Sequence, residues 1–484
     1  MIGTKPDSPT AWIDYLEGKL HTQSARGRHY ARYYDSEDKT LAFAQEKFRE
    51  HFGALFTGWR DNFAPLIVDS ISERLTVQGF RMGEDGEADP DALDIWQRSF
   101  LDAEANAAHI DALVYGSAYL VVWPGDDNEP LITPESAEHV VVQHTAGSRR
   151  KLDAAMKCFR DDWGVQHTTL WLPDGVYTSS RGEPGTEWSE PERTPNPFKA
   201  VPVVPLYNRR RLRPDPFSEL AALTPLLDAI SKVAADSIVA SEFAAFPQRI
   251  LTNLEPFEEG SEAAEREQAQ MVRAYIDRIL TFDGDVKASE FAAADLSNYV
   301  SLINMLVEHL AAQSRVPFTY FLLNNGTVPS GEGIAASEAG LVAKAKERML
   351  HFGESWETAL RLAFEIKGDK RAKAFDAETI WADPEHRSKA AQVDSLLKLK
   401  ELGVPEAQLQ EDYGYSPQVI SRFEEMKEAE LKRQAEWDKK YAPQPVGPDG
   451  KPLPANGAAT ATSLPKSAET ERRKEKEKKE LRAA

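Results

Sequence analysis

The residues best suited to chemistry in this 484-residue chain stand together late in the sequence. Asp383, Glu385 and His386 could hold a metal ion, because carboxylates and imidazole are ordinary zinc ligands. The same Asp-Pro-Glu-His stretch is also typical of a helix start, where an acidic side chain caps free backbone N–H groups. Capping is the simpler interpretation, and a carboxylate-dependent soluble enzyme stays open as an alternative.

Three further motifs resemble ligand sites but lack a defining residue. Acidic residues alternate between 85 and 91 as in a calcium loop, yet Pro90 stands where that loop needs glycine and Trp96 where it needs glutamate. Residues 331–336 follow a G-x-G-x-x-A spacing, but no strand leads into them. Residues 447–451 end in Gly-Lys and are followed by proline, which a phosphate-binding P-loop does not allow. We therefore predict no cofactor and no metal.

Nucleophilic catalysis has no candidate either. The single cysteine, Cys158, lies in a strand-like stretch with no base beside it, and a lone cysteine excludes an internal disulfide. The sequence contains no H-E-x-x-H and no G-x-S-x-G motif, and its ten histidines show no catalytic pairing. These patterns predict a protein without catalytic residues, that is, not an enzyme.

Charge argues against tight DNA binding but leaves one basic cluster to explain. The chain carries 78 acidic and 58 basic residues, a net charge of −20, whereas phosphate binding needs clustered lysine and arginine. The exception is the cluster Arg209, Arg210, Arg211 and Arg213. It is either a solvated turn or a contact with an acidic neighbouring subunit or with DNA phosphate.

The sequence shows no segment that would place it in a membrane. Residues 1–7 lack the apolar core of a signal peptide. The most apolar stretch, 112–123, is shorter than the about 20 residues that span a bilayer. We expect a soluble protein that is made in the cytoplasm and has no membrane partner.

The first half of the chain predicts helices followed by mixed α/β structure. Asp7 or Ser8 could cap a helix through Leu20, and apolar spacing predicts helices over 64–75 and 91–113. A buried strand is expected from Tyr115 to Trp123. Shorter strands are expected at 140–143, 155–160, 168–172 and 201–207.

The second half is dominated by long helices. Apolar spacing predicts one over 220–245 and a second, capped by Asp295, that continues to Ser314. Between them, 248–252 and 278–282 have extended character. A third long helix is expected over 333–365, and further helices over 384–441, one of which ends at Gly403. The Pro/Gly-rich and charged stretch 442–484 reads as a disordered tail. The predicted fold class is α+β, mostly helical.

The order of these elements, together with several local strings, resembles the portal proteins of tailed bacteriophages, specifically the siphophage type. The strings extend from about residue 64 to 426 and include Tyr115-Gly-Ser-Ala-Tyr-Leu-Val-Val122, Val201-Pro-Val-Val-Pro-Leu-Tyr-Asn-Arg209, Pro225-Leu-Leu-Asp-Ala229, Glu242-Phe-Ala-Ala-Phe-Pro-Gln-Arg249, Pro329-Ser-Gly331, Ala336-Ser-Glu-Ala-Gly-Leu-Val-Ala343, Phe352-Gly-Glu-Ser-Trp356 and Trp381-Ala-Asp-Pro-Glu385. One departure is Phe217, where the pattern leads us to expect a glycine before Ser218-Glu219.

The resemblance implies a portal fold with named parts. These are an N-terminal and α/β wing region (1–219), a first stem helix (220–245), a clip (246–294), a second stem helix (295–316), a tunnel loop (317–333), a long helix that returns to the wing (334–383), a helical crown (384–441) and the tail (442–484). Asn324, Asn325 and Thr327 would then be the residues of the tunnel loop that face DNA.

The resemblance also implies function and partners. It implies a dodecameric ring of identical chains at one capsid vertex of the virion, a conduit for double-stranded DNA during packaging and ejection. The ring would dock the terminase large subunit and later the head-tail adaptor, and would meet major capsid and scaffolding proteins during assembly in the host cytoplasm. Twelve copies would carry about −240 formal charges, so DNA would slide past with little adhesion. A different helical virion or scaffold protein, which docks through its charged tail, remains the other alternative.

Overall fold

The computed structural model describes residues 5–37, 62–83, 88–125, 127–209, 212, 216–245, 249–252, 287–290, 296–321, 331–385 and 389–441. The chain divides into two compact units, residues 1–417 and 418–484. Helices make up more than half of the described residues, and the described strands form four antiparallel sheets. This confirms the α+β, mostly helical fold class. No helix within these ranges is both long and apolar enough to cross a lipid bilayer.

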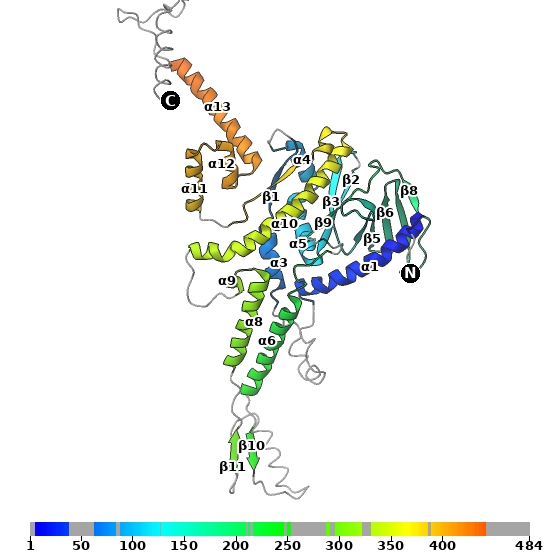
Figure 1. Cartoon of the computed structure of the whole chain (residues 1–484), viewed down its shortest axis with the longest axis vertical. Helices are drawn as coiled ribbons and strands as arrows, with labels where there is room; N and C mark the ends of the chain where they lie inside the picture. The colour runs from blue at the N-terminus through cyan, green and yellow to red at the C-terminus, as the bar shows by residue number, and fades with distance from the viewer. Residues whose placement is uncertain are drawn as a thin grey trace, which may run out of the picture. The chain divides into compact units, whose positions relative to one another are not determined.

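A five-stranded sheet forms one side of the α/β region, and α1 (Pro9–Tyr34) covers it (Figure 1). The Ser8 Oγ accepts a hydrogen bond from the Ala11 N–H at 3.3 Å, which confirms the predicted cap. Trp12, Leu16 and Leu20 of α1 are buried with Met156 of the sheet in one apolar cluster. The strands, in sheet order, are β4 (Val140–His144), β5 (Leu152–Arg160), β6 (Gln166–Leu172), β7 (Gly175–Arg181) and β8 (Glu192–Thr194).

A three-stranded sheet is buried on both faces because its central strand sends alternate side chains in opposite directions. Tyr119 and Val121 of this strand, β2, belong to a core shared with the five-stranded sheet. Leu120 and Val122 belong to the main core, which they share with the helices. The predicted strand at 115–123 is thus confirmed, and its neighbours are antiparallel. In order, the strands are β3 (Pro130–Ser136), β2 (Ser117–Pro124) and β9 (Val203–Tyr207).

The single helix predicted over 91–113 is wrong, because the chain breaks it in two. α4 (Pro90–Arg98) ends at Ser99, and α5 (Leu101–Tyr115) begins after Phe100, whose φ of 54° is left-handed. The Ser99 Oγ accepts a hydrogen bond from the Ile132 N–H at 3.0 Å, so the break is held by the neighbouring strand β3. A contact distant in sequence thus overrides continuous helical spacing.

Two short elements that apolar spacing did not predict complete this region. α3 (Ala64–Ser72) ends earlier than the predicted 64–75, and the chain turns into strand β1 (Val77–Arg81). β1 pairs with β12 (Glu378–Trp381), a strand 300 residues later in the chain. Such a long-range pair has no local signature in the sequence.

Two long helices lie side by side and project from the sheets in Figure 1. They are α6 (Thr224–Ala245) and α8 (Ser297–Ser314), which together we call the helical hairpin. The predicted helices are confirmed, with two corrections: residues 220–223 form turns before α6, and Leu296, instead of Asp295, occupies the N-cap of α8. Strand β10 (Arg249–Thr252) confirms the expected extended segment and pairs with β11 (Lys287–Glu290), while 278–282 lies outside the described residues.

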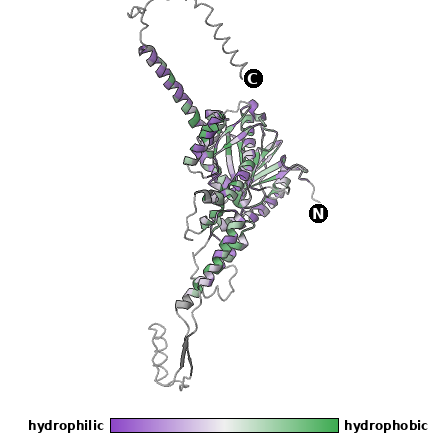
Figure 2. Ribbon diagram, turned by 60° about the vertical axis from the view of Figure 1, so that its left-hand side comes forward, coloured by the Kyte–Doolittle hydropathy of each residue, from purple (hydrophilic) through white to green (hydrophobic). Residues whose placement is uncertain are grey.

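The remaining helices follow the sequence closely. The short α9 (Phe318–Phe321) comes before the long α10 (Gly331–Ile366), and α11 (Lys389–Glu401) ends before Gly403, whose φ is 91°. After α11 comes α12 (Glu406–Tyr413). In the second unit, the described residues 418–441 belong to α13 (Pro417–Tyr441), which is coloured mainly hydrophilic in Figure 2 and has exposed side chains throughout its C-terminal half. The expected disordered tail lies outside the described residues.

A glycine in the middle of α1 is required by packing, and its replacement gives a sharp prediction. Alanine normally stabilises a helix relative to glycine by about 0.5–1 kcal/mol. A Cβ at Gly27, however, would lie 2.1 Å from the Tyr115 ring, which α5 holds in place. Gly27→Ala is therefore expected to lower the free energy of unfolding by about 1–3 kcal/mol, measured by urea denaturation.

Gly18 in the same helix is the matched control. A Cβ at Gly18 would meet no atom within 4 Å, so only the helix preference remains. Gly18→Ala should raise stability by about 0.5–1 kcal/mol. Equal effects of the two substitutions would contradict the packing of α1 on Tyr115.

A fully buried histidine lies at the centre of the main core. The Trp356 Nε1–H donates to His109 Nε2 at 3.0 Å, and the His109 ring stacks on Phe352. Burial lowers the pKa of the His109 imidazole to about 3, and a backbone hydrogen bond at Leu75 offsets only part of that shift. The ring is therefore neutral at pH 7, with its proton on Nδ1.

This histidine should make the protein acid-sensitive. Because the pKa of His109 is lower in the folded chain than its ordinary 6.5, the unfolded chain binds the proton first, and stability falls as pH drops below 6.5. Between pH 7 and pH 5 the wild type should lose about 2 kcal/mol more than a His109→Gln variant. Urea midpoints at the two pH values test this, since the other nine histidines are common to both proteins.

Candidate functional site: a buried charged face of α10

The N-terminal half of α10 buries three charged side chains on one face. Glu338, Lys344 and Arg348 are 5%, 8% and 1% exposed, in the same helix face as the apolar Leu341 and Phe352. Buried charges are costly unless they are paired, so each of them must have a partner. The partners come from four other segments of the chain.

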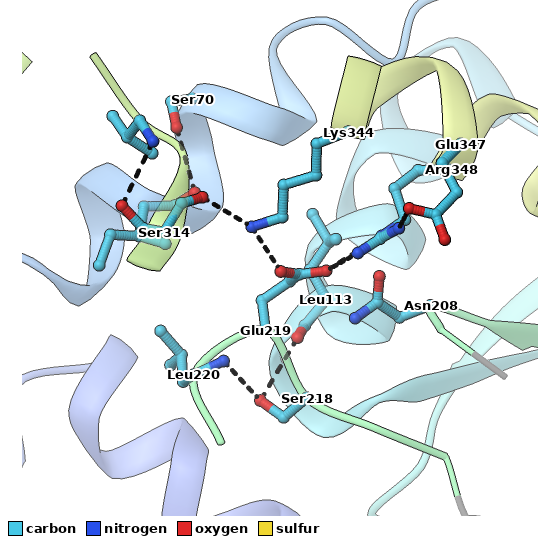
Figure 3. Close-up of polar contacts among 12 residues, drawn as sticks. Ser70, Leu113, Asn208, Ser218, Glu219, Leu220, Ser314, Lys344, Glu347 and Arg348 are labelled. Carbon is cyan, nitrogen blue, oxygen red and sulfur yellow. Dashed lines mark hydrogen bonds and ion pairs between the residues drawn. The ribbon is translucent and has the colours of Figure 1, made fainter. Parts of the chain in front are cut away.

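Glu219, in the turn before α6, pairs with two of these cations (Figure 3). Its Oε2 lies 2.6 Å from the Lys344 Nζ. Its Oε1 accepts from the Arg348 Nε at 3.0 Å and from the Arg348 Nη2. The other guanidinium nitrogen of Arg348, Nη1, lies 2.9 Å from the half-exposed carboxylate of Glu347. One carboxylate thus joins the start of the hairpin to two successive turns of α10.

The two cations keep Glu219 ionised. Burial alone would raise the pKa of Glu219, but the charges of Lys344 and Arg348 outweigh it and hold the pKa at about 2, below the ordinary 4.5. The stability from this pair is present above pH 4.5 and is lost as pH falls towards 2. Near neutral pH Glu219 exchanges no proton, so the arrangement supports anchoring and not acid–base catalysis.

A close backbone approach places Glu219. The Glu219 N–H donates to the Leu113 carbonyl at 2.9 Å, and the Asn208 side-chain amide donates to the Phe217 carbonyl at 2.9 Å. A Cβ on Gly116, whose φ is +90°, would lie 2.9 Å from the backbone of Phe217. The glycine that we expected at position 217 is thus not needed there, because Gly116 supplies the space from the opposite strand.

Lys344 also holds the far end of the hairpin. Its Nζ donates to the carbonyl of Ser314, the last residue of α8, at 3.0 Å (Figure 3). A helix end leaves carbonyl groups without partners inside the helix, so this bond also satisfies one of them. A single ammonium group of α10 therefore contacts the chain before α6 and the end of α8.

Glu338 forms a second cluster, which we call the Arg74 clamp (Arg74, Tyr320 and Glu338). The Tyr320 hydroxyl donates to Glu338 Oε1 at 2.6 Å, and Arg74 Nη2 donates to the Tyr320 oxygen at 3.0 Å. Arg74 Nη2 lies 3.4 Å from Glu338 Oε2, and both side chains are almost fully buried. Burial and the Glu338 carboxylate raise the pKa of Tyr320, so its hydroxyl stays protonated and can donate.

The residues singled out from the sequence lie elsewhere. Asn324, Asn325 and Thr327 lie outside the described residues, as do Arg210, Arg211 and Arg213, while Arg209 is exposed. Glu385 pairs with Lys346 at 3.0 Å, and the Glu385 N–H donates to Asp383 at 3.1 Å, as expected for a capping turn. Across the described ranges, no group of three or more histidine, cysteine, aspartate or glutamate side chains is arranged to hold a metal ion.

Sequence reasoning missed the charged face of α10, although a signal was present. Lys344 and Arg348 occupy positions that apolar helical spacing assigns to the core, where an unpaired charge would be too costly. Such a position predicts that a partner exists but does not identify it. Glu219 and Arg74 are 125 and 264 residues away from these partners in sequence, and only the fold joins them.

Comparison with known proteins shows relatives over most of the chain. Residues 23–433 match the family described as "Phage portal protein, SPP1 Gp6-like". The portal protein of Mycobacterium phage D29 is 30% identical over 470 residues, which cover 91% of this chain and 90% of that protein. The portal protein of Mycobacterium phage L5 is 30% identical over 463 residues, which cover 90% of each chain.

Solved structures with a partial likeness come from gene transfer agent particles. A chain in the neck of an empty particle, computed with C6 symmetry, has a TM-score of 0.46 and 13% identity, over 72% of this chain and 88% of that one. A chain of the native virion has a TM-score of 0.41 and 13% identity over the same shares. At these scores we draw no structural conclusion from either.

Proposed function

This chain belongs to the SPP1 Gp6-like family of phage portal proteins, and we propose that it forms a ring at one capsid vertex through which double-stranded DNA is packaged and ejected. The ring is a homo-oligomer, a dodecamer in our proposal, and its place in the mature particle is the virion vertex. The protein has a structural role and is not an enzyme. It assembles in the host cytoplasm before the head is filled.

The observation that carries this proposal is the anchoring of the helical hairpin. α6 and α8 begin and end at one ammonium group of α10, through Glu219 and the Ser314 carbonyl. A buried network of this kind fixes the hairpin rigidly to the body of the subunit. In a ring, such rigidity would let a wall of helices surround moving DNA without loss of register.

The parts of the subunit follow from this arrangement. We assign the α/β region to a wing, α6 and α8 to the stem, and 246–294 to a clip that faces the packaging motor. Residues 317–333 are assigned to the tunnel loop, α10 to the long helix behind it, and 384–441 to a crown. Asn324, Asn325 and Thr327 are our candidates for contact with DNA, and small polar side chains would allow it to slide.

The partners follow from the same assignment. The clip would bind the terminase large subunit during packaging and then the head-tail adaptor, while the wing would meet the major capsid and scaffolding proteins. Arg209, Arg210, Arg211 and Arg213 are our candidates for a contact with an acidic neighbouring subunit or with DNA phosphate. Arginine suits both, because its guanidinium pairs bidentately with carboxylate and phosphate.

Light scattering and particle images of the purified chain test the ring. Twelve copies of a 54.0 kDa chain should give a particle of about 650 kDa with a central hole. Filaments or irregular assemblies would favour a different helical virion or scaffold protein. A chain that stays monomeric even in the presence of capsid and scaffolding proteins would contradict the proposal.

A further inference from the structure

We propose that Arg74 is a positioning residue for the chain segment 322–330, because it holds together the two helices that flank this segment. α9 ends at Phe321 and α10 begins at Gly331, so nine residues connect them. The Arg74 clamp bridges the flanks directly. The proposal rests on the proposed function only for its DNA measurement.

The geometry of the clamp joins three segments at one point. Tyr320 lies one residue before the end of α9, and Glu338 lies two turns inside α10. Their hydroxyl and carboxylate are 2.6 Å apart, and the guanidinium of Arg74 contacts both groups. Removal of Arg74 would leave the carboxylate of Glu338 buried with a single hydrogen-bond donor.

The third segment is the end of α3, which belongs to the main core. Arg74 Nη1 donates to the Ser70 carbonyl at 3.1 Å, which fixes the direction of its side chain. α9 has a second contact with this region, since the rings of Phe63 and Phe321 meet edge to face with centroids 5.5 Å apart. The flanks of 322–330 are therefore tied to each other and to the body of the subunit.

The chemistry of the clamp suits positioning better than stability alone. An ion pair buried to this extent pays a desolvation cost for each charge, and apolar side chains of the same size would stabilise a fold at least as well. What a buried charged pair adds is directional bonding, which permits one spacing of the flanks and penalises others. A loop that meets moving DNA would need such a fixed base.

The experiment measures the spacing of the two flanks in the full-length protein. Nitroxide labels are attached at Thr319→Cys and Ala339→Cys, both exposed positions, in a Cys158→Ser background. Electron–electron double resonance then gives the distance distribution between the labels, with excess unlabelled chain to dilute signals between subunits. Arg74→Met is compared with the parent, and Tyr320→Phe serves as a milder variant that removes the central hydroxyl.

Arg181→Met is the matched control. Arg181 is also a buried arginine that pairs with a glutamate, Glu17, but it lies in the separate core beneath α1. We expect Arg74→Met and Tyr320→Phe to broaden the label distribution by at least twofold in width, and Arg181→Met to leave it unchanged at a similar loss of thermal midpoint. An unchanged distribution in both clamp variants would overturn the proposal.

The yield of DNA-filled heads separates this proposal from the proposed function. If Arg74→Met broadens the distribution and lowers the yield of filled heads at least tenfold while rings still form, both proposals are supported. If the distribution broadens and heads fill normally, the clamp is supported, and the role of 322–330 in the DNA path is rejected.

Discussion

Replacement of Glu219 by glutamine is expected to lower the free energy of unfolding by about 3–5 kcal/mol, because it leaves two cations buried without their carboxylate. Lys344 and Arg348 are at most 8% exposed, so water cannot take its place. Glutamine keeps the size of the side chain, and the loss therefore reports charge and not packing. No other described residue joins both ends of the hairpin to α10.

The measurement is urea denaturation followed by tryptophan fluorescence at pH 7. Hydrogen exchange should also rise locally, at the turns before α6 and at the end of α8. Glu347→Gln is the control, since Glu347 contacts the same Arg348 but is half-exposed, and its loss should cost less than about 1 kcal/mol. Equal losses from the two variants would show that Glu219 does not anchor the hairpin.

Trp356→Ala is expected to cost about 3–5 kcal/mol, since it opens a large cavity in the main core. The Trp356 side chain is fully buried, and its ring packs edge to face on Trp96 with centroids 4.9 Å apart. The substitution also leaves His109 Nε2 without its donor, which adds a further penalty for a buried polar atom.

Thermal and urea unfolding of the purified variant measure this loss. Trp163→Ala is the matched control, because Trp163 is 86% exposed at the turn between β5 and β6 and should change stability by less than about 0.5 kcal/mol. Trp356→Phe keeps most of the buried area and should fall between the two. A loss below about 1 kcal/mol for Trp356→Ala would mean that α10 does not pack on this core as described.

The sequence by itself determined the class of the fold, most long elements and the family. Apolar spacing identifies α1, α6, α8 and α10 because helical periodicity is a local property that each segment carries alone. The alternation along β2 identifies a strand buried on both faces for the same reason. Composition and missing motifs pointed away from enzymes, and the order of short strings indicated phage portal proteins.

Only the tertiary structure decided how these elements are joined. The break between α4 and α5 depends on a hydrogen bond from β3, and β1 finds its partner in β12 at the other end of the first unit. Glu219, Lys344 and Arg348, like Arg74 and Glu338, are separated by 119 residues or more between partners. Periodicity can show that a charge at a core position needs a counter-charge. Which residue supplies it is set by the packing of the whole chain, because pairing energy depends on distance in space and not on distance in sequence.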